Sequence, residues 1–236
     1  MKVLVIGSTG SSGRAVVKEL ETRGHEVTAF TRRADAFEPR GWLTIHEGDV
    51  MDPASVDAAV AGHDAVVVTL GIAESALAVR LRGSQRTPMN VRSAGTRHVI
   101  EAMHRHGVDR LVVQTTYGQG ETAGRLTPLW RLAFALVLQP QIRDTRIQEQ
   151  IVRDSGLDWV LVQPVSLTDD ADHVAPFASV DGDVTGMKVS RTAVARVHAD
   201  AVTSDQWRHR TVSVSTGVDS GAAGHVGPTA LAAPTR

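Results

Sequence analysis

The sequence predicts a single α/β domain with a doubly wound, mainly parallel sheet. Short apolar runs alternate with amphipathic segments along the chain, and the first apolar run ends in a glycine-rich turn followed by a helical pattern. The chain has 236 residues, enough for one α/β domain with a sizeable core. We expect this domain to cover residues 1–217 and the Gly-, Ala- and Pro-rich residues 218–236 to form a flexible tail.

The strands are predicted from short runs rich in Val, Leu and Ile, which are typical of strands buried on both faces. In chain order, these runs are Lys2–Ile6, Glu26–Thr31, Leu43–His46, Ala65–Thr69, Arg110–Gln114 and Trp159–Gln163. Amphipathic patterns predict helices over Arg14–Arg23, Pro53–Ala61, Pro88–His106, Gln141–Ser155 and Arg191–Thr203. The last helix leads into Thr211–Val214, which we expect to be an edge strand.

The composition excludes several classes of partner. There are 25 basic and 26 acidic side chains, so no excess of positive charge indicates a nucleic-acid surface. The chain lacks cysteine, which excludes disulfides and thiolate nucleophiles. The most apolar stretch, Leu129–Leu138, contains Arg131 and is too short to span a membrane. The first predicted strand leaves no room for a signal peptide before it, so we expect a cytoplasmic protein.

The glycine-rich turn has the spacing of a phosphate cradle. Gly7 permits a tight turn out of the strand, Gly10 lets the backbone approach a pyrophosphate, and Gly13 lets the next helix pack closely against the sheet. The position between the first strand and a helix is the context that this motif requires. We therefore predict a nucleotide cofactor held by the whole turn, which consists of Gly7, Ser8, Thr9, Gly10, Ser11, Ser12 and Gly13.

The end of the second predicted strand indicates which dinucleotide is bound. NAD sites usually have an Asp or Glu there, whereas this chain has Thr31, Arg32 and Arg33. A guanidinium binds a 2′-phosphate with charge-assisted hydrogen bonds, so NADP(H) is favoured over NAD(H). Asp35 follows just beyond the strand end, and the alternative is that the two arginines only keep a surface loop soluble.

Further motifs follow the glycine turn in a recognisable order: Gly48-Asp49-Val50, Val66–Gly71, Asn90-Val91, Gly95-Thr96, Gly107–Val112, Ser155–Trp159 and Gln163-Pro164. With this order and spacing, the chain resembles the atypical short-chain dehydrogenase/reductases. It is most similar to their NAD(P)H-binding subgroup, which includes NmrA-like proteins and the flavin and biliverdin-IXβ reductases. This resemblance implies a Rossmann-like domain, mostly linked to NADPH, with a small C-terminal portion on the substrate side.

The resemblance also implies the roles of further residues. It places Asp49 and Val50 beside the adenine, and Thr69, Leu70 and Gly71 beside the ribose and pyrophosphate. It adds Thr115, Pro164 and Val165 to the cofactor pocket, although Thr115 also suits the simpler role of ending its strand. Thr116 occupies the position of the hydroxyl residue that lies beside the nicotinamide in this superfamily.

The chain departs from the better-known dehydrogenases at their proton relay. They use Tyr-x-x-x-Lys, but four residues after Tyr117, the only tyrosine, this chain has Glu121. The candidate catalytic residues are Thr116, Tyr117 and Arg146, with a packing role as the alternative for Tyr117 and a solvated helix face as the alternative for Arg146. An arginine stays protonated, so Arg146 is predicted to position or to stabilise charge.

We expect no catalytic metal and no nucleic-acid or membrane partner. His104 and His106 are two apart on a predicted helix and point in different directions. The loops Ala73–Thr87 and Gly118–Thr127 follow the fourth and fifth predicted strands, where doubly wound folds bind their ligands. Leu129–Leu138 is predicted to supply an apolar wall or a dimer contact, which favours an apolar or aromatic small substrate and leaves monomer and homodimer open.

These observations lead to an NADPH-dependent reductase of a flavin-, quinone- or conjugated-carbonyl-type small molecule. Such acceptors form stabilised anions and need no strong side-chain acid, which suits the missing Tyr-Lys relay. Two alternatives stay open at this point. One is a non-catalytic NADP(H) sensor, and the other is a redox-neutral enzyme, an isomerase or lyase, on the same fold.

Overall fold

The computed structural model describes residues 1–38, 40–72, 87–125, 139–170 and 174–217. In this part of the chain, eight strands form one sheet in the order β3-β2-β1-β4-β5-β6-β10-β8. The strands of this sheet are β1 (Lys2–Ile6), β2 (Glu26–Thr31), β3 (Leu43–Glu47), β4 (Ala65–Val68), β5 (Arg110–Gln114), β6 (Asp158–Pro164), β8 (Pro176–Ser179) and β10 (Arg210–Thr216). All pairs are parallel except β8 with β10, which confirms the predicted doubly wound, mainly parallel sheet.

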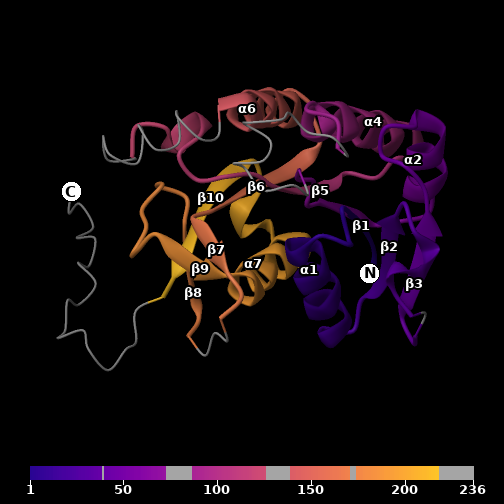
Figure 1. Cartoon of the computed structure of the whole chain (residues 1–236), viewed down its shortest axis with the longest axis horizontal. Helices are drawn as coiled ribbons and strands as arrows, with labels where there is room; N and C mark the ends of the chain where they lie inside the picture. The colour runs from indigo at the N-terminus through magenta and orange to yellow at the C-terminus, as the bar shows by residue number, and fades with distance from the viewer. Residues whose placement is uncertain (39, 73–86, 126–138, 171–173, 218–236) are drawn as a thin grey trace, which may run out of the picture.

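Helices cover both faces of the sheet (Figure 1). One face packs against α1 (Ser11–Thr22) and α7 (Arg191–Thr203), and the other against α2 (Pro53–Val60), α4 (Val91–His106) and α6 (Gln139–Arg153). Short 3-10 turns lie at Ala34–Ala36, Gly120–Thr122 and Asp205–Trp207, and β7 (Ser166–Thr168) pairs with β9 (Lys188–Ser190) outside the main sheet.

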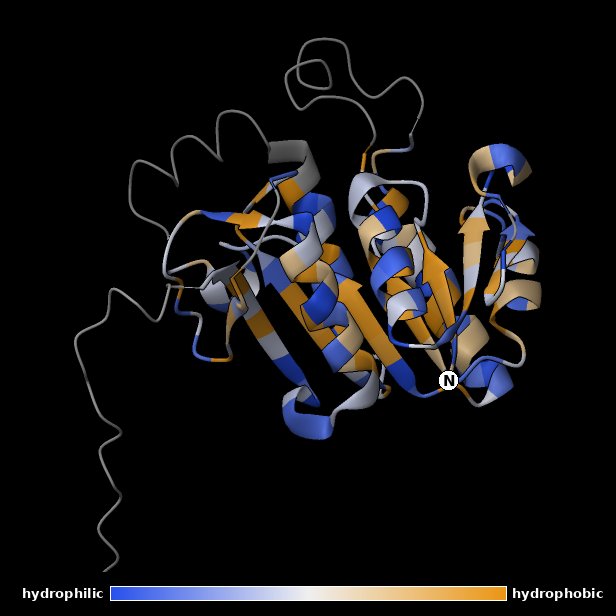
Figure 2. Ribbon diagram, turned by 90° about the horizontal axis from the view of Figure 1, so that it is seen from below, coloured by the Kyte–Doolittle hydropathy of each residue, from blue (hydrophilic) through white to orange (hydrophobic). Residues whose placement is uncertain are grey.

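Two buried clusters form the core because successive strand residues point to opposite faces. In β1, Val3 and Val5 belong to the cluster under α1 and α7, whereas Leu4 and Ile6 belong to the cluster under α2, α4 and α6. Figure 2 shows hydrophobic residues concentrated in the strands and hydrophilic ones on the helices and turns. This double burial accounts for the continuous apolar runs in the sequence.

The last predicted strand differs from its expectation. We expected Thr211–Val214 to be an edge strand, but β10 lies inside the sheet between β6 and β8. Ser213 of this strand is buried, and its hydroxyl donates to the carbonyls of Ser179 (3.1 Å) and Asp183 (2.7 Å). The predicted edge position was therefore wrong, because β8 pairs with β10 on the side away from β6 and hydrogen bonds to residues distant in sequence satisfy the buried serine.

Other differences are confined to element ends and to short strands. Helix α1 begins at Ser11 rather than Arg14, and β4 ends one residue before Thr69. The strands β7, β8 and β9 lack an apolar run long enough to predict them. Within the described residues, no helix has the length and apolar character needed to cross a membrane. The segment Leu129–Leu138 and the expected tail 218–236 lie outside the described residues.

Candidate functional site

The candidate site lies at the carboxyl ends of the central parallel strands. Strand β1 pairs with both β2 and β4, so the chain order reverses beside it, and the crevice at such a point is where doubly wound sheets bind ligands. The glycine turn connects β1 to α1 at this position. The sequence thus brings its strongest motif to the edge of the sheet that the topology favours for binding.

Two of the three glycines in the turn are fixed by contacts within the protein. Gly7 has φ +82°, and a Cβ on it would lie 2.9 Å from the Thr69 carbonyl carbon. A Cβ on Gly13 would lie 2.2 Å from the Gly7 carbonyl oxygen, so only glycine lets α1 pack against the turn. These contacts confirm the geometric reasons expected for both residues.

Gly10 differs from the other two glycines. Its φ of −67° is accessible to any residue, and a Cβ there would meet one described atom, the Gly7 carbonyl oxygen at 3.4 Å. Neither the backbone conformation nor packing therefore requires glycine at this position. The vacant outer face of Gly10 suits the close approach of a ligand, so the residues present fit the pyrophosphate of a dinucleotide.

The N-terminus of α1 is also free to receive an anion. The structure shows no side-chain cap at Gly10 and no acidic residue in the first turn of α1. Three other helix N-termini are occupied by protein groups: Asp52 caps α2, Ser190 caps α7, and Asp144 of α6 accepts from the Arg92 N–H (3.0 Å) at the start of α4. Among these four helices, only α1 presents uncapped N–H groups to the crevice.

The polar residues of the turn divide into internal and outward-facing groups. Ser8 is buried, and its hydroxyl donates to the Phe30 carbonyl of β2 (2.8 Å), so its side chain holds the turn to the sheet. Thr9 is half-buried, Ser11 is exposed and Ser12 is half-buried. Any cofactor contact of Ser8 would therefore use its backbone, whereas Thr9, Ser11 and Ser12 retain accessible surface.

The end of β2 exposes the two predicted arginines. The hydroxyl of Thr31 is tied to the backbone of Arg33, accepting from its N–H (3.1 Å) and donating to its carbonyl (3.2 Å). Arg32 and Arg33 are exposed, and no described residue forms an ion pair with either. The Asp35 carboxylate forms no ion pair with either arginine in the described part of the chain.

Sequence reasoning missed a third cation at this edge. Arg14 follows the last glycine on α1, donates to the Ala36 carbonyl (3.1 Å) and lies over the Phe37 ring, with its guanidinium carbon 4.7 Å from the ring centroid. These contacts direct Arg14 toward the loop that carries Arg32 and Arg33. Its position directly after Gly13 was the signal that could have identified it.

Close packing against α4 holds Val50, which was predicted beside the adenine, and Leu70, which was predicted beside the ribose and pyrophosphate. Val50 and Leu70 are both buried, and a Cβ on Gly95 would lie 2.8 Å from Val50 Cγ2 and 2.9 Å from Leu70 Cδ1. The ring of His98 donates from Nδ1 to the Val50 carbonyl (2.9 Å). Asp49 is exposed, and its carboxylate accepts from the Met51 N–H (3.0 Å). Gly95 and His98 thus hold this segment in place.

The end of β4 encloses the glycine turn. The Thr69 hydroxyl donates to the Ile6 carbonyl (3.1 Å), and its N–H donates to the same carbonyl (2.9 Å). Gly71 is exposed. The structure therefore brings Thr69 to the turn, with its side chain engaged by β1, whereas a Cβ on Gly71 would lie 3.6 Å from Arg92 Nη2 of α4. The following loop, residues 73–86, lies outside the described residues.

Two candidate catalytic residues, Thr116 and Tyr117, follow β5 and have different surroundings. Thr116 is half-buried, and no described residue hydrogen-bonds its hydroxyl. Tyr117 is 3% exposed, packs in the core, and donates its hydroxyl to the Gly182 carbonyl (3.0 Å). Burial raises the pKa of the Tyr117 hydroxyl. The arrangement leaves Thr116 available to a substrate and supports the packing role of Tyr117.

Beneath this segment lies a buried polar network that the sequence did not reveal. Glu149 of α6 is 1% exposed and accepts from the Thr115 hydroxyl (2.7 Å) and the Gln163 amide (2.7 Å). The amide oxygen of Gln163 accepts from the Thr122 hydroxyl (2.7 Å), which in turn accepts from the Gly118 N–H (2.7 Å). The Thr115 side chain therefore faces α6, and the network fixes the loop that carries Thr116.

Three other predicted residues lie around this network. Arg146 is exposed and donates from Nε to Gln119 Oε1 (3.0 Å) at the loop. Pro164 and Val165 are buried: the Pro164 carbonyl accepts from the Tyr117 N–H (3.1 Å), and the Val165 N–H donates to Val214 (3.1 Å). These contacts place Arg146 beside the loop, join Pro164 to the segment after β5, and join Val165 to β10.

The histidines do not converge in the described part of the chain. His104 bonds the Ser155 carbonyl (2.9 Å), whereas His106 lies 3.2 Å from a carboxylate oxygen of Asp57. No group of three or more potential metal-ligating side chains is present among the described residues. His173 lies outside them.

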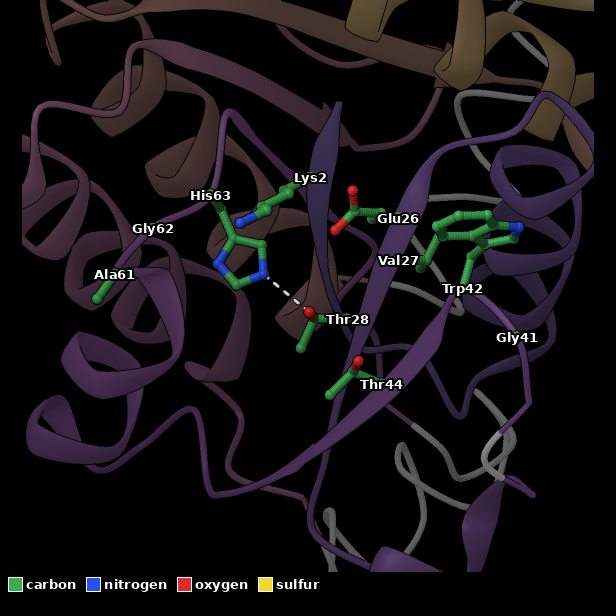
Figure 3. A pocket seen from close by; sticks show the side chains of 10 residues that line it. All are labelled: Lys2, Glu26, Val27, Thr28, Gly41, Trp42, Thr44, Ala61, Gly62 and His63. Atoms are coloured by element: carbon green, nitrogen blue, oxygen red, sulfur yellow. Dashed lines mark hydrogen bonds between the residues drawn. The ribbon is translucent and has the colours of Figure 1, made fainter.

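A shallow hollow of about 380 Å³ lies at the opposite, amino end of the strands (Figure 3). In it, the His63 ring bonds the Thr28 hydroxyl (2.8 Å), and burial lowers the pKa of His63. Its other lining residues include Lys2, Trp42 and Thr44. None of the predicted cofactor or catalytic residues lines this hollow, so it is separate from the candidate site.

Comparisons with known proteins agree with this geometry. A family model described as NAD(P)H-binding matches residues 7–205. An uncharacterized chloroplastic protein of Arabidopsis thaliana is 26% identical over 90% of this chain and 76% of its own length. A 2-alkyl-3-oxoalkanoate reductase of Stenotrophomonas maltophilia is 37% identical over 49% of this chain, and the match spans only 33% of that reductase.

Solved structures share the fold over nearly the whole chain. An oxidoreductase, YlbE, from Lactococcus lactis superimposes with a TM-score of 0.75 at 19% identity, covering 92% of this chain and 91% of its own. A short-chain dehydrogenase/reductase of Veillonella parvula in complex with NADP gives 0.74 at 16% identity, covering 90% and 93%. Anaerobillin reductase ChuY of Escherichia coli gives 0.69 at 19% identity, covering 91% and 96%.

Proposed function

The chain belongs to the NAD(P)H-binding family, and from that premise we propose that it is an NADPH-dependent reductase of a small apolar or aromatic molecule. Its acceptor would be of the flavin, quinone or conjugated-carbonyl type. The observation that supports this proposal most strongly is Gly10, whose outer face no described residue fills. A dinucleotide pyrophosphate would occupy that face, against the uncapped N-terminus of α1.

The choice of NADPH over NADH follows from the charges at the end of β2. Arg32 and Arg33 are exposed there without a carboxylate partner among the described residues, and Arg14 extends toward the same loop. A 2′-phosphate carries negative charge that these guanidinium groups would bind, and an NAD ribose offers no such charge.

The residues after β5 define the chemistry that the protein contributes. Bound NADPH would supply the hydride. Thr116 has a half-buried hydroxyl without a described hydrogen-bond partner, and it would orient the oxygen of the acceptor. Tyr117 cannot readily deliver a proton, because its hydroxyl is committed to Gly182 and its pKa is raised by burial. The proton would then come from water or through Thr116, which suits acceptors that form stabilised anions.

The proposal is tested by acceptor reduction, followed as loss of NADPH absorbance, with wild type and Thr116→Val. We expect the wild type to oxidise NADPH with at least one flavin, quinone or enone. Loss of one hydrogen bond, worth about 1.4 kcal/mol, would lower kcat about tenfold in the variant. NADPH affinity is expected to stay unchanged. Binding of NADPH without oxidation by any of these acceptors would contradict the reductase and favour the non-catalytic sensor.

A further inference from the structure

One polar atom at the candidate site has no partner. Gln114 is the last residue of β5, and its Nε2 donates to the Ser12 hydroxyl at the start of α1 (3.2 Å). Its other amide atom, Oε1, is buried and accepts no hydrogen bond from any described residue. Buried amide oxygens in native proteins nearly always have a partner, so this atom is a candidate for a ligand contact.

The direction of the Gln114 side chain is set by the strand. Val112 lies two residues earlier on the same face, in the core cluster that includes Val16 of α1. Gln114 therefore extends from the carboxyl end of β5 toward the first turn of α1, and the hydrogen bond to Ser12 confirms this. The side chain lies across the crevice between these two elements.

The topology assigns Gln114 to one half of a dinucleotide. The sheet order is β2-β1-β4-β5, with the glycine turn at the end of β1 and the exposed arginines at the end of β2. If the pyrophosphate lies on the turn and the adenosine over β2, the other half of the molecule lies over β4 and β5. Gln114 is thus on the nicotinamide side, as Arg32 is on the adenosine side.

We propose that Gln114 is a cofactor-positioning residue whose Oε1 accepts a hydrogen bond from the nicotinamide half of NADPH, from a ribose hydroxyl or the carboxamide N–H. The Ser12 hydroxyl holds the amide so that Oε1 faces the crevice. This inference rests on the proposed NADPH site and adds a residue to it.

The test compares the affinities of three ligands by calorimetry: 2′,5′-ADP, 2′-phospho-ADP-ribose and NADPH. The variant Gln114→Met keeps the side-chain length and removes the acceptor. We expect it to weaken NADPH binding about tenfold, as for one lost hydrogen bond, and to leave 2′,5′-ADP unaffected. A loss already seen with 2′-phospho-ADP-ribose would assign the ribose hydroxyl, and a loss seen only with NADPH the carboxamide.

Ser11→Ala is the control: Ser11 is an exposed residue of the same turn, and no hydrogen bond joins it to Gln114 among the described residues. It is expected to weaken all three ligands alike, through the phosphate that they share. Unchanged 2′,5′-ADP binding also shows that Gln114→Met is folded. The inference is overturned if Gln114→Met weakens all three ligands equally, as is expected of Ser11→Ala, or weakens none. A wild type that binds neither NADPH nor 2′,5′-ADP would instead overturn the proposed function itself.

Discussion

At the residue scale, the three glycines of the turn have different causes. Gly7 is required by its positive φ, and Gly13 is required by its close contact with the backbone of the turn. Gly10 is required by neither, and we propose that its role is to let a ligand approach the backbone. On this proposal, the motif combines two residues that build the turn with one that serves binding.

This difference predicts opposite phenotypes for two alanine variants. Gly10→Ala is expected to change the free energy of unfolding by less than about 1 kcal/mol, but to weaken NADPH binding at least about tenfold, because its Cβ enters the ligand's space. Gly13→Ala is expected to lower the free energy of unfolding by about 1–3 kcal/mol, because its Cβ meets the Gly7 carbonyl. Urea unfolding and calorimetry measure the two quantities. A fully stable Gly13→Ala would contradict the assigned contact.

Arg32 allows a prediction about cofactor choice. Arg32→Ala removes an exposed guanidinium and is expected to weaken NADPH binding about tenfold while leaving NADH binding nearly unchanged. The ratio of the two dissociation constants is the measurement. Arg208→Ala, at the opposite end of the sheet beside Asp158, serves as a charge-matched control. Equal losses for both cofactors would show that Arg32 does not recognise the 2′-phosphate.

At the scale of elements, the loop after β5 is held by α6 through Glu149. The carboxylate binds donors on β5 and β6, and its other oxygen lies 3.3 Å from Arg153 Nη1. Replacing it by an amide leaves an unmatched donor in the buried network. Glu149→Gln is therefore expected to lower the free energy of unfolding by about 2 kcal/mol in urea denaturation.

Glu121→Gln is the control for this network. Glu121 also lies near Arg153 (3.5 Å), but its side chain is 58% exposed, and the expected change is below about 0.5 kcal/mol. If Glu149→Gln proved as mild as Glu121→Gln, the network would not be what fixes the loop. If Glu149→Gln lowered the free energy of unfolding while Thr116 kept its orientation, the kcat of the folded enzyme would change little.

The main elements could be predicted because their patterns are local. Each central strand is buried on both faces and reads as an apolar run, and the glycine spacing predicts the turn from β1 to α1. The internal position of β10 could not be predicted, because its buried serines are satisfied by the distant Ser179 and Asp183 carbonyls. Hydrogen bonds of that range leave no trace in a local pattern.

The candidate site could likewise be predicted only where it rests on a local motif. The cradle residues follow from a motif, whereas Glu149 reads as a surface residue of an amphipathic helix, and only the packing of α6 on β5 shows that it is buried. Tyr117 was drawn into the catalytic set as the only tyrosine of the chain, but its hydroxyl bonds Gly182, 65 residues away in sequence. Residue type alone could identify candidate catalytic residues, but only tertiary contacts show which of them the protein already engages.

At the scale of the whole molecule, acid stability depends on His198 in α7. It is fully buried, and burial lowers its pKa to about 4. Below the ordinary pKa of about 6.5, the unfolded chain binds a proton that the folded protein does not, so stability falls as the pH decreases toward 4. The expected contribution is about 3 kcal/mol lost between pH 7 and pH 4.

His198→Leu removes this titration. Its free energy of unfolding is expected to depend less steeply on pH between 7 and 4 than that of the wild type, by the same amount. Urea unfolding at several pH values measures the two slopes. Identical slopes would mean that His198 titrates normally and that its burial is not maintained in solution.

At the point where the sheet reverses its order, helix α1 presents an N-terminus without a side-chain cap, and the proposed function depends on it. A calorimetric titration of the wild-type protein with NADPH and with NADH tests this central claim most directly. The account predicts one site that binds NADPH more tightly than NADH. Absence of binding by both dinucleotides would show that the glycine turn is only structural, and would contradict the account.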